Sequence, residues 1–174
     1  MRKLSIHELN RLSKESFQKK DKIPVVVVLD NIRSMHNVGS VFRTADAFLI
    51  EEILLCGITA QPPKPEIHKT ALGATETVDW SYHQSAAEAV KSLKKQGYTV
   101  VLIEQTDHSI ELVDFEFRNE KYAFVFGNEV NGVSNDVVPL ADMAVEIPQF
   151  GTKHSFNVSV CAGIVLYAVF QARR

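Results

Sequence analysis

One arginine stands in a helix whose other residues suit a protein core. Residues 31–48 read NIRSMHNVGSVFRTADAF, and the spacing of their apolar side chains predicts a helix from residue 37 or 38 to about residue 49. Arg43 falls nearly opposite the apolar face of that helix, where a solvated helix would carry lysine or glutamate. This arrangement leaves room beside the guanidinium for a large neighbour, because the surrounding residues are small: Gly39, Ser40, Thr44 and Ala47.

The chemistry of this helix start suits a nucleic acid. A guanidinium binds phosphate through paired hydrogen bonds. Asn37 is predicted as the N-cap, and the unpaired N–H groups at a helix start attract anions. The alternatives are a second subunit against the small residues, or an ion pair of Arg43 with Asp46 or Glu129. We take Arg43 as the first candidate for contact with a nucleic-acid substrate.

Polar residues collect in the segments that follow predicted strands. Ligands of parallel sheets bind outside the carboxyl ends of the strands, so these segments are expected to form one crevice. Between the glycines of GNEVNG, Glu129 is the only carboxylate, and it can bind a hydroxyl group or orient Arg43. The alternative is that these are the ordinary polar loops of any α/β protein. The segments are DNIRSMHN (30–37), EQTDH (104–108), GNEVNG (127–132) and IPQFGTKHSFN (147–157).

The last predicted helix, residues 155–174, is apolar around most of its circumference. Ser155 is expected to be its N-cap, with Asn157 just inside. A helix that is apolar all round must be buried. Burial can come from a second copy of the chain, since Ser159, Ala162 and Gly163 would let another backbone approach. The alternative is deep burial inside one subunit.

The order of predicted elements indicates an α/β fold with a mainly parallel sheet. The run IPVVVVLD (23–30) is uninterrupted and β-branched, as expected for a strand covered on both faces. Residues 58–70 are expected to form a proline-rich loop. Other strands are expected at 51–57, 76–83, 98–104, 121–127 and 143–148, and helices at 5–19 and 85–96, each opened by a capping box.

Composition bounds the protein class. The 174 residues are 45% hydrophobic and 23% charged, which suits one globular domain. Cys56 and Cys161 lie far apart in apolar surroundings, which predicts buried thiols in a reducing compartment. The chain has no zinc-ligand spacing, P-loop, dinucleotide fingerprint, signal peptide or membrane-spanning run. We expect a soluble, cytoplasmic protein without a metal.

The N-terminal segment is basic although the net charge of the chain is −2. Residues 1–22 carry seven Lys or Arg residues against three Asp or Glu residues. Such a segment can contact phosphates. A solvated helix with lysines on its wet face explains the same pattern.

Three of the polar segments together resemble the motifs of a known family. They are N-x-G-x-x-x-R-T-A (37–45), F-G-N-E-x-x-G (126–132) and I-P-x-x-G-x-x-x-S-x-N-V-S-V (147–160). Their order and spacing resemble the SpoU family of RNA ribose 2′-O-methyltransferases, within the SPOUT superfamily. The resemblance covers residues 23–170. The first loop, NIRSMHN, departs from the common Asn-Pro-Gly-Asn form, and Phe156 stands where leucine is usual.

The resemblance implies a fold, a cofactor and a partner. The fold would be an α/β sheet with helices on both faces and a deep trefoil knot in its C-terminal part, with residues 23–174 as the methyltransferase domain and 1–22 as a helical extension. It implies a homodimer through the C-terminal helix. It also implies S-adenosylmethionine in a pocket that uses Glu104, Gln105, Gly127, Ile147, Ser155 and Phe156.

The resemblance further implies a catalytic group around Arg43, which would serve the cofactor of the other subunit. Because arginine stays protonated, we expect it to hold a phosphate and stabilise the developing alkoxide rather than act as a base. Asn37 and Asn157 would position Arg43 or the ribose, Glu129 would orient these groups, and Ser155 could bind cofactor or substrate.

The substrate is expected to be tRNA rather than rRNA, because the chain is compact, although rRNA stays open. One alternative is an RNA-binding protein of the same fold that lacks catalysis, which the intact motif residues argue against. Another is a nucleotide enzyme on a flavodoxin-like sheet, which the missing phosphate motif argues against.

Overall fold

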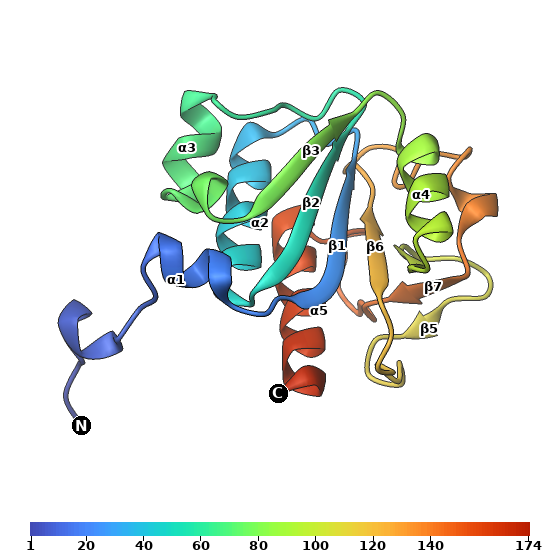
Figure 1. Ribbon diagram of the computed structural model, residues 1–174. Coiled ribbons are helices and arrows are strands. Elements are labelled where there is room, and N and C mark those ends of the chain that lie inside the picture. Colours follow the sequence, from blue (N-terminus) through green and yellow to red (C-terminus); the bar gives the residue numbers. More distant parts are fainter.

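The structure is a computed structural model that describes residues 1–174, apart from the side chains of Ile6 and His7. It is an α/β fold, as predicted (Figure 1). The strands are β1 (Ile23–Asp30), β2 (Ile50–Cys56), β3 (Asp79–His83), β4 (Thr99–Ile103), β5 (Ile110–Glu111), β6 (Tyr122–Phe126) and β7 (Met143–Glu146). The helices are η1 (Ile6–Leu9), α1 (Lys14–Lys19), α2 (Met35–Ala47), α3 (Pro65–Ala71), η2 (Ala74–Glu76), α4 (Ala86–Lys95), η3 (Val138–Leu140) and α5 (Val158–Arg173).

The sheet has seven parallel strands in the order β3-β2-β1-β6-β4-β7-β5. Strand β1 lies near the middle, and the side chains of residues 25–30 are buried on both of its faces. All five residues of β6 are buried as well. Parallel strands covered on both faces have such continuous apolar runs. The predicted parallel sheet is therefore confirmed, and β6 lies beside β1 although about 90 residues separate them.

Helices cover both faces of the sheet, also as predicted. Helices α2, α3 and α5 pack with one apolar cluster, and α4 packs with the cluster on the other face (Figure 1). Helix α4 begins as predicted, because the Ser85 side chain accepts a hydrogen bond from the Glu88 N–H at 3.3 Å. Gly97 ends the turn after α4 with a φ of 84°, a conformation that favours glycine. The threading of a C-terminal knot stays a prediction.

The prediction of one helix over residues 5–19 is wrong. The capping box of Ser5 and Glu8 is present, but it opens only the short helix η1. Asn10 then adopts a left-handed conformation with a φ of 46°, and Ser13 caps the separate helix α1. Helix α1 packs on the body through Phe17, whose side chain is buried in the larger apolar cluster. A local cap therefore started a helix that the left-handed residue ended after one turn.

Three further predictions about helix ends and loops are wrong. The proline-rich loop over 58–70 contains α3, because Pro65 occupies the first helical turn, where its missing N–H costs nothing. Ser34, rather than Asn37, caps α2 and accepts the Asn37 N–H at 3.3 Å. Asn157, rather than Ser155, caps α5. The short edge strand β5 was not predicted. Among the helices that the structure describes, none combines the length and hydropathy needed to cross a bilayer.

Candidate active site

The carboxyl ends of β4, β6 and β7 meet the start of α5 around one cavity. It has a volume of about 250 Å³. The predicted polar crevice therefore exists, and three of the four polar segments contribute to it. All six residues that the resemblance assigned to a cofactor line the cavity, as does Glu129: Glu104, Gln105, Gly127, Ile147, Ser155 and Phe156.

The fold of the loop after β6 depends on close backbone approach at Gly127. A β-carbon on Gly127 would overlap the backbone of Gly132 and Val133, so only glycine fits there. Glu104 ties this loop to the end of β4, because its carboxylate accepts the Val133 N–H at 3.1 Å and the Gln105 N–H at 3.0 Å. Two loops that line the cavity are thus held by one side chain.

Three of the predicted catalytic residues form a chain of hydrogen bonds. The Asn37 side-chain amide donates to Glu129 Oε1 at 2.6 Å. The Asn157 side-chain amide donates to Asn37 Oδ1 at 3.1 Å. Asn157 Oδ1 in turn accepts the Ser159 N–H at 3.0 Å and the Ser159 hydroxyl at 2.7 Å. This chain joins the first turns of α2 and α5 to the loop after β6, so each amide has a fixed orientation.

Arg43 stands apart from this chain on the exposed side of α2. Arg43 pairs with neither of the two predicted partners: Asp46 instead accepts a 2.5 Å hydrogen bond from the Thr77 hydroxyl, and Glu129 Oε1 accepts the Asn37 amide. Within the described part of the chain, Arg43 makes no hydrogen bond or ion pair, so the alternative of an internal ion pair is wrong for the single chain. Arg43 also does not line the cavity of its own subunit.

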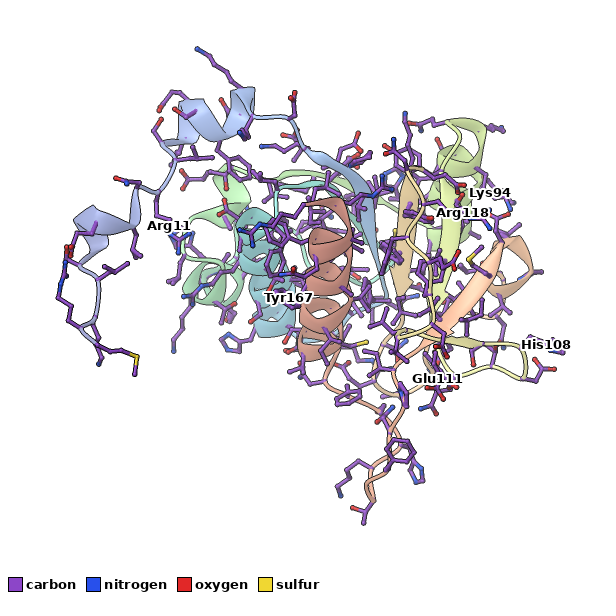
Figure 2. The ribbon with its side chains drawn as sticks, turned by 90° about the horizontal axis from the view of Figure 1, so that it is seen from below. Arg11, Lys94, His108, Glu111, Arg118 and Tyr167 are labelled. Carbon is purple, nitrogen blue, oxygen red and sulfur yellow. The ribbon has the colours of Figure 1, made fainter. Side chains whose placement is uncertain are left out.

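Several lining residues were not predicted as site residues. Gln149 and His154 come from the segment before α5, which is drawn in orange and protrudes from the body (Figure 2). Both lie inside the polar segment 147–157, so their position in that segment is the sequence feature that could have identified them as site residues. Asn128 is buried, and its side-chain Oδ1 accepts the N–H groups of Val130 and Asn131 at 3.1 and 3.0 Å. Its role is to close the loop that carries Glu129.

Burial holds the two thiols in their protonated form at neutral pH. Cys161 lines the cavity, and burial, together with the charge of Glu104, raises the pKa of its thiol to about 12. Burial and the charge of Asp30 raise the pKa of Cys56 to about 12 as well. Because the thiolate is the nucleophilic form, neither cysteine offers nucleophilic catalysis. The prediction of plain buried thiols is confirmed for Cys56, while Cys161 is half-buried.

Known sequences resemble this chain over most of its length. Residues 24–167 match the SpoU rRNA Methylase family. The 23S rRNA (guanosine-2′-O-)-methyltransferase RlmB of Neisseria meningitidis is 34% identical over 145 residues, which cover 82% of this chain and 56% of that protein. The tRNA (guanosine(18)-2′-O)-methyltransferase of Thermus thermophilus is 30% identical over 167 residues, which cover 96% of this chain and 83% of that protein. The chain thus spans little more than half the length of the RlmB relative.

Solved structures share the fold. The TrmH/SpoU tRNA modifying enzyme of A. aeolicus superposes with a TM-score of 0.81 at 26% identity, covering 92% of this chain and 80% of that one. The SpoU methyltransferase AviRb of Streptomyces viridochromogenes, crystallised in complex with the cofactor AdoMet, has a TM-score of 0.76 at 26% identity, covering 90% of this chain and 63% of that one. With the family match over residues 24–167, these findings show that the chain belongs to the SpoU rRNA methylase family.

Proposed function

We propose that this protein transfers the methyl group of S-adenosylmethionine to a ribose 2′-OH of tRNA or rRNA. One observation carries the proposal. The cavity at the carboxyl ends of the strands is lined by Glu129, and the same carboxylate anchors the amide chain of Asn37 and Asn157. Glu129 therefore joins the proposed cofactor cavity to the oriented side chains of Asn37 and Asn157. Both relatives are named as 2′-O-methyltransferases of guanosine in RNA, which supports the same reaction.

The cavity suits S-adenosylmethionine by its chemistry. Its apolar lining offers surfaces for an adenine ring, and Gly127 lines the cavity in a loop whose close backbone packing on Gly132 and Val133 needs glycine there. Glu104, Gln105 and Ser155 also line the cavity and supply polar contacts. When bound, the cofactor supplies an electrophilic methyl group. The apolar side chains are Ile103, Phe126, Val130, Ile147, Phe156 and Val158.

The chain's own residues would bind and orient the ribose. Glu129 Oε1 accepts the Asn37 amide, and Oε2 has no hydrogen-bond partner among the described residues, so Oε2 can accept a ribose hydroxyl. The remaining amide hydrogens of Asn37 and Asn157, and the Ser155 hydroxyl, are further contacts for the ribose. Arg43 stays protonated, so it would hold the adjacent phosphate and stabilise the developing alkoxide. Alignment by these groups would supply much of the acceleration.

A homodimer through α5 would bring Arg43 to the cavity of the partner. Helix α5 leaves an apolar stripe exposed, with 51% of Val160, 36% of Ile164 and 53% of Tyr167 accessible to solvent. Tyr167, labelled in Figure 2, also packs against Phe48 at the end of α2, with ring centroids 5.9 Å apart. The helix that carries Arg43 therefore borders the stripe. Packing this stripe against the same stripe of a second subunit would remove both apolar surfaces from water.

We favour tRNA as the substrate and the cytoplasm as the place of action. The likeness to the Thermus thermophilus tRNA enzyme covers 96% of this chain, and therefore most of residues 1–22. The basic residues of this segment other than Lys22 are exposed and would contact phosphates beside the methyltransferase domain, residues 23–174.

A paired assay of Arg43→Ala tests the proposal. We expect the wild-type protein to transfer a tritiated methyl group from S-adenosylmethionine to tRNA, and the variant to lose at least about a hundredfold in rate, as happens when a charge-stabilising donor is removed. Calorimetry should show that both bind S-adenosylmethionine within about twofold of each other. Retained turnover in the variant would reject the role of Arg43. A wild-type protein that binds RNA and cofactor without transfer would favour the RNA-binding alternative.

A further inference from the structure

We propose that a second cavity, beside the candidate active site, binds an unpaired nucleobase of the RNA, with Arg33 reading its edge. The proposal rests on the proposed function in one respect, that the protein's substrate is RNA. The cavity has a volume of about 530 Å³, within the range of about 300–1,000 Å³ that is usual for small-molecule sites. Arg33 lies in the loop between β1 and α2, where the sequence departs from the common family pattern.

The two cavities share a wall. Asn128 lines both of them. Val133 lines the second cavity, and its N–H is bonded to Glu104, which lines the first. The loop from Gly127 to Val133 therefore separates them, with Glu129 on the side of the first. A ribose held at Glu129 would place its own base, or that of its neighbour in the strand, within reach of the second cavity.

The floor of the second cavity is fixed by a buried carboxylate. Asp30 is fully buried and accepts the Ser134 N–H at 2.7 Å and the Asn31 side-chain amide at 2.8 Å. Asn31 adopts a left-handed conformation with a φ of 56°, and its side-chain Oδ1 accepts the Ile58 N–H at 3.1 Å. These bonds link the loops after β1, β2 and β6 before any ligand arrives. Such preorganisation lowers the entropic cost of binding.

The exposed groups of the cavity suit a base better than a phosphate. The side chains of Arg33, Asn131 and Asn135 are exposed and form no hydrogen bond with the described residues, so they are available to a ligand. Amides and a guanidinium pair with base edges, and arginine pairs most often with the O6 and N7 atoms of guanine. Ile58 is 64% exposed on the wall and offers an apolar surface to the face of a base.

Charge argues in the same direction. The Asp30 carboxylate is bonded to Asn31 and Ser134, which line the cavity, and both donors are neutral, so its negative charge would oppose a phosphate there. A neutral base meets no such repulsion. The base is taken to be unpaired, because an unstacked base exposes its edge to side chains. Guanine is the base that this set of donors favours.

Binding of short RNAs to Arg33→Ala tests the proposal without needing the natural target. The probes are a fluorescent uridine decamer and decamers with one central guanine, adenine or cytosine. We expect the wild-type protein to bind the guanine decamer about tenfold more tightly than the uridine decamer, the discrimination that one bidentate contact gives. Arg33→Ala should bind all four equally, and Asn135→Ala should retain a reduced preference.

The matched control is Arg118→Ala. Arg118, labelled in Figure 2, is also an exposed arginine without a side-chain hydrogen bond to the described residues, but it precedes β6 at the opposite end of that strand. This variant should keep the guanine preference. Two results overturn the proposal. The first is that the wild-type protein shows no base preference. The second is that Arg33→Ala weakens the binding of all four decamers equally and makes the salt dependence of binding shallower, which marks a phosphate contact. If the wild-type protein fails to transfer a methyl group, the proposed function fails. The base preference is measured by binding alone, so it is tested independently of that result.

Discussion

The Asn37 side-chain amide donates a hydrogen bond of 2.6 Å to Glu129, and thereby fixes the first turn of α2 against the loop after β6. The two residues are 92 positions apart in the chain. Their meeting depends on the pairing of β1 with β6, which puts the loops that follow both strands at one edge of the sheet. A charged acceptor makes this bond stronger than one between neutral groups.

Glu129→Gln should slow methyl transfer about tenfold to a hundredfold with little change in cofactor affinity. The amide can still meet Asn37, but it lacks the charge that orients the Asn37 donor and receives the ribose hydroxyl. Single-turnover transfer and calorimetry with S-adenosylmethionine measure the two quantities. Glu116→Gln, an exposed glutamate in the loop before β6, is the control and should leave both unchanged. An unaltered transfer rate for Glu129→Gln would remove Glu129 from the catalytic group.

Gly127→Ala should destabilise the fold by about 1–3 kcal/mol, the usual cost of an inserted methyl group in a packed site. The new β-carbon would overlap the backbone of Gly132 and Val133, so the loop must shift. Since this loop lines the cavity, affinity for S-adenosylmethionine should fall as well. Urea unfolding and calorimetry measure the two effects. A β-carbon on Gly151 would meet nothing within 4 Å, so Gly151→Ala should change stability by less than about 0.5 kcal/mol.

Ile164→Asp should turn the proposed dimer into a monomer. Ile164 lies between Val160 and Tyr167 on one face of α5, and a carboxylate there would be buried against its copy without a partner. Sedimentation velocity measures the assembly state, and methyl transfer should fall with it because Arg43 would lose the partner's cavity. Val113→Asp, at a residue that is 79% exposed elsewhere, should stay dimeric. A wild-type protein that sediments as a monomer would contradict the dimer.

Asp142→Asn should lower stability at neutral pH by at most about 1 kcal/mol, because its partner Lys94 is 38% exposed and solvent screens the pair. Burial opposes ionisation of Asp142, but hydrogen bonds from Lys94 at 2.6 Å and from the Val100 N–H at 2.8 Å outweigh it, and its pKa lies below the ordinary 3.8. The charged form is therefore the one that folding favours.

The stability difference between wild type and Asp142→Asn should consequently be present above pH 3.8 and disappear as the pH falls through the lower pKa of the folded state. Urea unfolding between about pH 7 and pH 2 measures it. Other acidic groups with low pKa values, such as Glu8, are common to both proteins and cancel in the difference. A difference that stays constant down to the lowest pH would show that the charge of Asp142 has no part in it.

Local sequence patterns determined the elements on which this site stands. Continuous apolar runs predicted β1 and β6, because strands covered on both faces require them. The capping box predicted the start of α4, because both partners lie within one turn. The motif segments were recognisable because glycine, asparagine and arginine stand at fixed local spacings. Such signals act over a few residues, so they can be read directly from the chain.

Tertiary structure decided which of these segments meet. The Asn157–Asn37–Glu129 hydrogen bonds, the shared wall of the two cavities and the isolation of Arg43 all depend on the strand order, which no local pattern specifies. The caps show the same division. Several polar residues near each helix start could serve as caps locally, and the folded backbone chose Ser34 and Asn157. With Ser34 as the cap, the Asn37 side chain is released from the helix start and reaches Glu129 instead.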